Sequence, residues 1–156
     1  MTDIRFRAYR KGSKFYKARM FYDIQNAYDG FGVYTEEEAF CPPSVLDSFG
    51  SYLDDDNYAV EQYIGVHDKQ NQSIYVGDFV FNEYPWVSSI IQLVYVKDGI
   101  FYATGSLNGQ NIIPNYYHNY LTVLGNVHED LRLYTELSKR NTITLEEAYR
   151  IKSKII

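Results

Sequence analysis

The fold of this chain is decided by the run VYVKDGIFY at residues 94–102. Asp98-Gly99 stands there between two short runs of β-branched and aromatic residues, which is typical of the two-residue turn that closes a β-hairpin. Outward from this hairpin, similar runs predict strands at 59–65, 74–80, 86–97, 100–105 and 120–126, the second of them interrupted at Gly77-Asp78. Short strands separated by turn residues favour a mainly β fold, a small antiparallel barrel, over a parallel sheet with crossover helices.

The N-terminal residues predict a second hairpin, and it is strongly basic. Residues 4–9 and 15–24 alternate between polar and apolar side chains, and the turn-like segment 10–13 separates them. If the two strands pair, one solvated face would gather four basic side chains: Arg5, Arg7, Lys17 and Arg19. These four residues form a candidate contact face, although a shift of one residue in the register would move them.

The C-terminal residues predict two helices. Residues 129–139 have a helical pattern, and Thr144 and Glu147 form a capping box that opens a second helix. The apolar residues of that helix lie on one stripe: Leu145, Ala148, Ile151 and Ile155. A helix of about 12 residues is marginal alone, so it must pack on the barrel or on another subunit. We therefore expect a β domain over residues 1–133 and a C-terminal helical extension over residues 134–156.

Charge is unevenly distributed along the chain. The net charge of −5 over 156 residues combines +6 in residues 1–19, −13 in residues 20–133 and +2 in residues 134–156. A basic segment beside an acidic body would dock within the chain, pair with a neighbouring subunit or bind an anion. We favour self-complementarity, because the acidic body supplies the counter-charge and because nucleic-acid-binding domains are more often basic throughout.

Composition also bears on the compartment. No apolar run approaches the roughly 18 residues that span a bilayer, and residues 1–12 lack the apolar region of a signal peptide. The one cysteine, Cys41, has no partner for an internal disulfide, which agrees with a reducing compartment. We expect a cytoplasmic protein with no membrane partner.

Residue types that carry catalysis are present, but not in a recognisable arrangement. Cys41 stands in no motif that supplies a base, and the three histidines, His67, His118 and His128, lack the spacing of a metal site. No glycine-rich phosphate loop with its lysine is present. We therefore expect no catalytic residue, no cofactor and no metal, and we do not expect an enzyme.

Three blocks of sequence carry a resemblance to a known family. They are IRFRAY at residues 4–9, QYIGVHDK at 62–69 followed by IYVGDFV at 74–80, and LGNVHEDL at 124–131. Over roughly residues 4–133 the chain resembles the YopX-like proteins of bacteriophages and prophages. It departs from the family at Ile64, where a Thr is usual, and at Val76, where a Glu is usual. A site that depended on that Thr and that Glu would be lost here.

The resemblance implies an SH3-like barrel in a phage-encoded protein of the bacterial cytoplasm, and it implies no established activity. The family motif comprises Gln62, Tyr63, Gly65, Asp68, Tyr75, Gly77, Asp78, Gly125 and Asn126. Gly77 permits a bulge or a close backbone approach, and Asp78 is suited to cap the turn that follows. We expect the motif to be structural rather than a binding site.

Two kinds of function remain open. The first is a non-enzymatic interaction module that holds a protein partner or assembles with itself, which the aromatic content of 17% suits because Tyr and Phe favour contact surfaces. The alternative is a nucleic-acid-binding protein that uses the basic N-terminal hairpin, with Tyr9 or Tyr16 stacking on bases. The acidic body argues against the alternative, and a steep salt dependence of DNA binding would support it.

Overall fold

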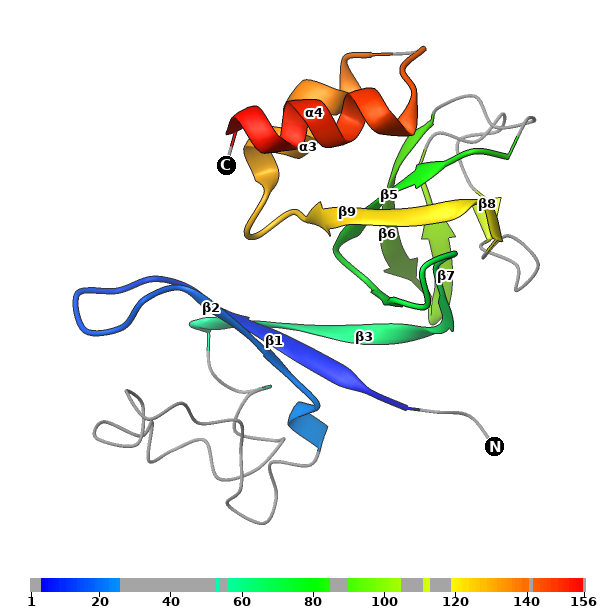
Figure 1. The fold of residues 1–156 in the computed structure, drawn as a ribbon. Helices are drawn as coiled ribbons and strands as arrows, with labels where there is room; N and C mark the ends of the chain where they lie inside the picture. Colours follow the sequence, from blue (N-terminus) through cyan, green and yellow to red (C-terminus); the bar gives the residue numbers. More distant parts are fainter. Residues whose placement is uncertain are drawn as a thin grey trace. The chain divides into compact units, whose positions relative to one another are not determined.

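The computed structural model describes residues 4–25, 53, 56–84, 90–104, 111–112, 119–140 and 142–155. The chain divides into two compact units, an N-terminal unit of residues 1–63 and a C-terminal unit of residues 64–156. Both are shown in Figure 1. The regular structure is mainly antiparallel β-sheet with two C-terminal helices, so the expected mainly β class is confirmed.

The N-terminal unit is built on three antiparallel strands. β1 (Phe6–Arg10) lies between β2 (Arg19–Tyr22) and the first part of β3 (Tyr58–His67). Apolar residues from all three strands pack into a small core together with Ile24, which follows β2: Phe6, Ala8, Phe21, Tyr58 and Val60. The loop that joins β1 to β2 extends beyond the ends of these strands (Figure 1).

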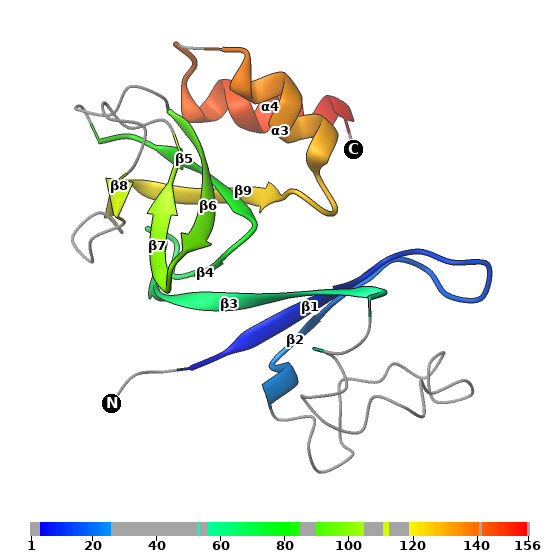
Figure 2. The ribbon, with the colours of Figure 1, turned by 180° about the vertical axis from the view of Figure 1, so that it is seen from behind.

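The C-terminal unit contains the remaining strands. The end of β3 pairs with β4. The strands after β4 form a five-stranded sheet in the order β8-β7-β6-β5-β9. The strand bounds are Ser73–Tyr75 (β4), Asp78–Asn82 (β5), Ile91–Lys97 (β6), Ile100–Ala103 (β7), Asn111–Ile112 (β8) and Leu121–Asn126 (β9). The sheet is strongly curved (Figure 2). One apolar core of this unit comprises Val66, Ile74, Val80, Val94 and Leu121.

The β6–β7 turn is the feature that the sequence predicts best. Lys97 pairs with Ile100, and the two residues between them, Asp98 and Gly99, have φ values of 53° and 76°. Two successive positive φ values are the signature of the type I′ turn that Asp-Gly favours. The predicted hairpin at residues 94–102 is confirmed.

Two helices cover one face of the curved sheet (Figure 2). α3 (Leu131–Ser138) and α4 (Leu145–Ile155) enclose a core with strand residues Phe79, Phe81, Ile91 and Leu124. The Thr144 hydroxyl accepts a hydrogen bond from the Glu147 N–H at 3.1 Å, as the capping box predicts. In the part of the chain that the structure describes, no helix has the length and apolar character needed to cross a bilayer.

The predicted domain boundary does not coincide with a boundary in the structure. Residue 133 lies inside α3, where Leu133 and Leu137 both insert into the core shared with the strands. The predicted stripe of α4 packs into the same core through Ala148, with Leu145, Ile151 and Ile155 against it. Residues 134–155 are therefore part of the C-terminal unit. Their apolar side chains cover one face of its sheet.

Candidate binding surface

The observed register separates the four basic residues that the sequence places on one candidate face. Arg10 lies opposite Arg19, and Arg7 lies opposite Tyr22, in the β1–β2 pairing. Directly opposite residues of an antiparallel pair project from the same face, and successive residues project from opposite faces. Arg19 therefore shares a face with Arg10, while Arg7 projects from the other face. The single face expected from Arg5, Arg7, Lys17 and Arg19 is not formed.

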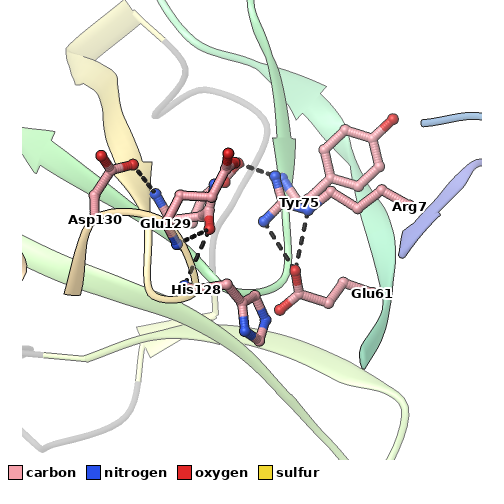
Figure 3. Close-up of polar contacts among 8 residues, drawn as sticks. Arg7, Glu61, Tyr75, His128, Glu129 and Asp130 are labelled. Carbon is pink, nitrogen blue, oxygen red and sulfur yellow. Dashed lines mark hydrogen bonds and ion pairs between the residues drawn. The ribbon is translucent and has the colours of Figure 1, made fainter. Parts of the chain in front are cut away.

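Arg7 is a structural residue. Its side chain is 2% exposed, and its Nη2 lies 3.0 Å from Oε1 of Glu61, the residue directly opposite in β3. Its Nε donates a second hydrogen bond to the same oxygen at 3.1 Å (Figure 3). A buried charge keeps such a partner because the unpaired ion would be very costly to bury. Arg7 is thus not a surface cation.

Arg5 is also held by its own unit. Its guanidinium carbon lies 4.0 Å from the centroid of the Tyr63 ring, and the Arg5 carbonyl accepts a hydrogen bond from the Tyr63 N–H at 2.8 Å. A cation at this distance from an aromatic face is attracted by the ring. Arg5 and Tyr63 therefore stabilise the start of the sheet.

The other basic residues gather at the loop between β1 and β2. Residues 10–19, RKGSKFYKAR, contain five basic side chains and no acidic one, and we call this segment the basic loop. Lys11, Lys14 and Lys17 are exposed, and Phe15 beside them is 82% exposed. Among the residues that the structure describes, no carboxylate forms an ion pair with these three lysines. Lys11 Nζ donates a hydrogen bond to the Asp56 carbonyl at 3.3 Å. The loop thus presents a large apolar ring beside three exposed lysines.

Internal hydrogen bonds fix the conformation of the basic loop. The Ser13 hydroxyl accepts hydrogen bonds from the N–H groups of Phe15 and Tyr16, and the Ser13 N–H donates to the Tyr16 carbonyl at 2.8 Å. The Arg10 guanidinium donates to the Lys17 carbonyl at 2.8 and 3.3 Å. Because the backbone is held before any partner arrives, binding at the loop costs little ordering entropy.

Aromatic rings contact the two arginines at the ends of the basic loop. The Arg10 guanidinium carbon lies 4.7 Å from the centroid of the Tyr16 ring and 5.2 Å from that of Phe21, and that of Arg19 lies 5.0 Å from the Phe21 ring. Contacts between a cation and a ring face are attractive. They explain how two arginines occupy opposed positions on neighbouring strands.

A hollow lies beside the basic loop, within the N-terminal unit. It has a volume of about 260 Å³ and is lined by Arg10, Lys11, Ser13, Phe15, Tyr16, Asn57 and Tyr58. The Lys11 N–H donates to the Asn57 carbonyl at 2.9 Å, which ties the loop to the segment that leads into β3. A more open hollow of about 440 Å³ on the loop itself shares Ser13, Phe15 and Tyr16. Aromatic and basic side chains thus line both.

In the C-terminal unit, the family motif residues have internal partners. Asp68 is 3% exposed, and its carboxylate accepts hydrogen bonds from the backbone N–H groups of Gln70, Gln72 and Val123 at 2.8 to 2.9 Å. The first two bonds close the turn after β3. The third reaches β9 beside the bulge that opposes Phe79 and Val80. Asp68 therefore joins a turn to a strand and is not free to act on a ligand.

Tyr75, Gly77 and Asp78 form the turn between β4 and β5. The Asp78 carboxylate accepts the Tyr75 N–H at 2.9 Å, and Gly77 has a φ of 92°, which a residue with a side chain rarely adopts. The Gly77 N–H donates to the Val94 carbonyl at 2.9 Å. The interruption at Gly77-Asp78 that the sequence predicts within residues 74–80 is therefore observed, and β4 and β5 are two strands separated by this turn.

Gly125 and Asn126 organise the link from β9 to α3. The Asn126 Oδ1 accepts the N–H groups of His128 and Glu129, both at 3.0 Å, and its Nδ2 donates to the Glu129 carboxylate at 2.8 Å (Figure 3). A Cβ on Gly125 would come within 2.8 Å of the Asp130 carboxyl carbon. Glycine is required there because the carboxylate occupies the space of a side chain.

The remaining motif residues lie in β3. Gln62 pairs with Phe6 of β1, Tyr63 is buried, and Gly65 has a φ of 91° near the end of the strand. A shallow hollow of about 480 Å³ lies at this end of the strand, lined by Gly65, Val66, His67, Asp68, Lys69, Asn71 and Asn119. Its charged groups are engaged, since Asp68 holds backbone amides and Lys69 pairs with Glu83. The charged side chains that line this hollow are thus already bonded within the protein, which argues against a binding site there.

The other catalytic and metal candidates do not come together in the described part of the chain. His67 lies 3.4 Å from the Ser73 hydroxyl, and the N–H of His128 is held by Asn126. Cys41 and His118 lie outside the described residues. Within the described ranges, no group of three His, Cys, Asp or Glu side chains is arranged to hold a metal ion.

Sequence reasoning identified Lys17 and Arg19 of the basic loop but missed four other members. These are Arg10, Lys11, Lys14 and Phe15. The composition of this segment indicates a basic loop, because half of residues 10–19 are basic and none is acidic. The alternating pattern instead extended the predicted strand back to residue 15, and this concealed the loop.

Known proteins resemble this chain over most of its length. The model of the family described as YopX protein matches residues 5–134. No curated protein matches the chain. Among solved structures, protein EF1440 from Enterococcus faecalis is similar at 15% sequence identity and a TM-score of 0.47, over 86% of this chain and 99% of that chain. Because the family match covers well over half of its residues, the chain belongs to the YopX family.

Proposed function

We propose that the protein is a non-enzymatic interaction module and that the basic loop is its contact surface. The observation that carries this proposal is Phe15, whose ring is 82% exposed between lysines that form no ion pair among the described residues. A large apolar side chain with a polar rim is the usual composition of a binding site. The motif residues of the C-terminal unit support the choice of the basic loop as the contact surface, because their polar side chains already bond to backbone N–H groups.

The partner of such a surface carries negative charge. Exposed charges farther apart than about 8 Å are largely screened at physiological ionic strength. A partner at the loop therefore responds to the exposed Lys11, Lys14 and Lys17 more than to the net charge of −5 of the whole chain. An acidic protein surface, including that of a second copy, has the required charge, and so does a nucleic acid.

We include an SH3-like barrel in this proposal as the finer description of the fold. It is supported by short antiparallel strands around one apolar core in the C-terminal unit. Small barrels of this kind carry many unrelated binding sites, so the fold alone does not identify the partner.

Two variants with the same change in net charge test the role of the loop. The first replaces Lys11, Lys14 and Lys17 by Gln. The matched control replaces three exposed cations of the C-terminal unit, Arg140, Arg150 and Lys154, by Gln. Light scattering at low and high salt measures self-association, and titration with labelled polyglutamate and a labelled oligonucleotide measures binding to anionic partners.

The proposal expects self-association or anion binding that weakens in salt, is lost in the loop variant and persists in the control. Equal behaviour of the two variants would show that binding follows net charge and not the loop. A monomer that binds neither anionic probe would also contradict the proposal.

A further inference from the structure

We infer that the anionic partner of the basic loop is a single-stranded nucleic acid, with phosphates against the lysines and one base against Phe15. This inference rests on the proposed function and names the class of partner. It is argued from the exposed ring, the adjoining hollow, the spacing of the cations and the rigidity of the loop.

Phe15 presents a face on which a base can stack. Phe15 is 82% exposed, and Lys14 Nζ lies 6.0 Å from the centroid of its ring. Proteins that bind single strands combine exposed aromatic rings with cations that follow the backbone of the nucleic acid. The bases of a duplex are already stacked, so an exposed ring of this kind favours an unpaired strand.

The hollow beside the loop has the size and lining for one base. At about 260 Å³ it is smaller than the roughly 300 Å³ at which pockets for drug-sized ligands begin. Phe15, Tyr16 and Tyr58 provide aromatic walls, and Ser13 provides a hydroxyl group in the lining. An acidic peptide would use the lysines but has no planar group that would require these walls.

Three exposed lysines of the loop are available to phosphates. Lys11, Lys14 and Lys17 recur at every third residue of the loop, and all three are exposed. Arg10 holds the Lys17 carbonyl, so the loop that displays them is already ordered. Phosphate contacts supply most of the affinity of such complexes and make it depend on salt.

Fluorescence anisotropy with three labelled probes tests the inference. The probes are an oligothymidylate of about ten nucleotides, which suits the site size of a small domain, an abasic strand of equal length, and polyglutamate. The abasic strand keeps the phosphates and removes the bases. Each probe is titrated at several salt concentrations against the wild-type protein and three variants.

The first variant, Phe15→Ala, removes the ring, and its matched control, Leu131→Ala, removes a side chain that is 57% exposed in the C-terminal unit. The third variant, Lys14→Gln with Lys17→Gln, removes two cations. Unfolding in urea establishes that all three variants are folded, which is expected because none of the replaced side chains is buried.

The inference expects the oligothymidylate to bind about tenfold or more tightly than the abasic strand, and Phe15→Ala to remove that difference. Leu131→Ala should bind as wild type does. The double lysine variant should reduce the slope of log K against log salt by about 1.4, since each contact to a single strand contributes about 0.7.

Equal affinity for the oligothymidylate and the abasic strand, with no effect of Phe15→Ala, would overturn the inference. If polyglutamate then binds and the lysine variant loses it, the loop recognises an acidic protein surface, and the proposed function stands without the inference. If none of the probes depends on Phe15 or on the lysines, both proposals fail.

Discussion

Asp68 and Lys17 are both charged residues beside strands, but the molecule uses them in different ways. Asp68 is 3% exposed and holds three backbone N–H groups with its carboxylate. Lys17 is exposed, and among the described residues the contact recorded for it is the hydrogen bond that its backbone carbonyl accepts from Arg10. The same contrast separates the motif of the C-terminal unit from the basic loop of the N-terminal unit. Polar groups that satisfy buried backbone stabilise the fold, whereas exposed unpaired groups are available to a partner.

This comparison predicts that substitutions divide into those that alter stability and those that alter binding. Arg7→Met should have the largest effect, a loss of about 3–5 kcal/mol in the free energy of unfolding, because the buried Glu61 carboxylate would lose its ion pair with Arg7. Urea unfolding measures the loss.

The double variant Arg7→Met with Glu61→Leu should recover much of that stability, because both charges are removed together. A loss below about 1 kcal/mol for Arg7→Met alone would show that the ion pair is not buried in solution.

Asp68→Ala should cost roughly 3 kcal/mol, because three N–H groups would lose their acceptor. The neighbouring variant Lys69→Gln breaks only the exposed pair with Glu83 and should change stability by less than about 1 kcal/mol. The two are compared by urea unfolding. Similar losses for the two variants would remove the distinction between the motif and ordinary surface charge.

Gly125→Ala should cost about 1–3 kcal/mol, because the new methyl group would collide with the Asp130 carboxylate. Thermal or urea unfolding of Gly125→Ala, Asp130→Ala and the double variant forms a thermodynamic cycle. The cost of the methyl group should be smaller when Asp130 is already Ala. Strict additivity would mean that the collision is not the cause.

The smallest effect on stability is expected at the basic loop. Lys14→Gln with Lys17→Gln should change the free energy of unfolding by no more than about 0.5 kcal/mol, since neither side chain is buried or paired among the described residues. Urea unfolding checks this value. A loss of several kcal/mol would show that the two lysines stabilise the fold, and it would contradict their assignment to the contact surface.

Features governed by local chemistry were predictable from the sequence. Asp98-Gly99 predicts its turn because few other dipeptides adopt two positive φ values, and Thr144 with Glu147 predicts the start of α4 because the cap is a contact within one helical turn. The structural role expected for Asp68 and Asp78 agrees with their bonds to nearby backbone.

Features that depend on long-range pairing were not predictable. Residues 15–18 alternate as a strand would, but the Ser13 hydroxyl takes the N–H groups of Phe15 and Tyr16, which are then unavailable to a sheet. β2 therefore begins at Arg19, and the register separates Arg7 from Arg19. Since side chains alternate with a period of two, no local pattern distinguishes one register from its neighbour when both faces carry arginine.

The most direct test of the account is to map the partner onto the protein by NMR. The amide shifts of ¹⁵N-labelled protein are followed while an oligothymidylate of about ten nucleotides is added. We predict shift changes concentrated in residues 10–19 and at Asn57 and Tyr58, which line the hollow beside Phe15. Changes concentrated instead around Gly65, Asn71 and Asn119 would contradict the account, because they would place the binding surface in the C-terminal unit.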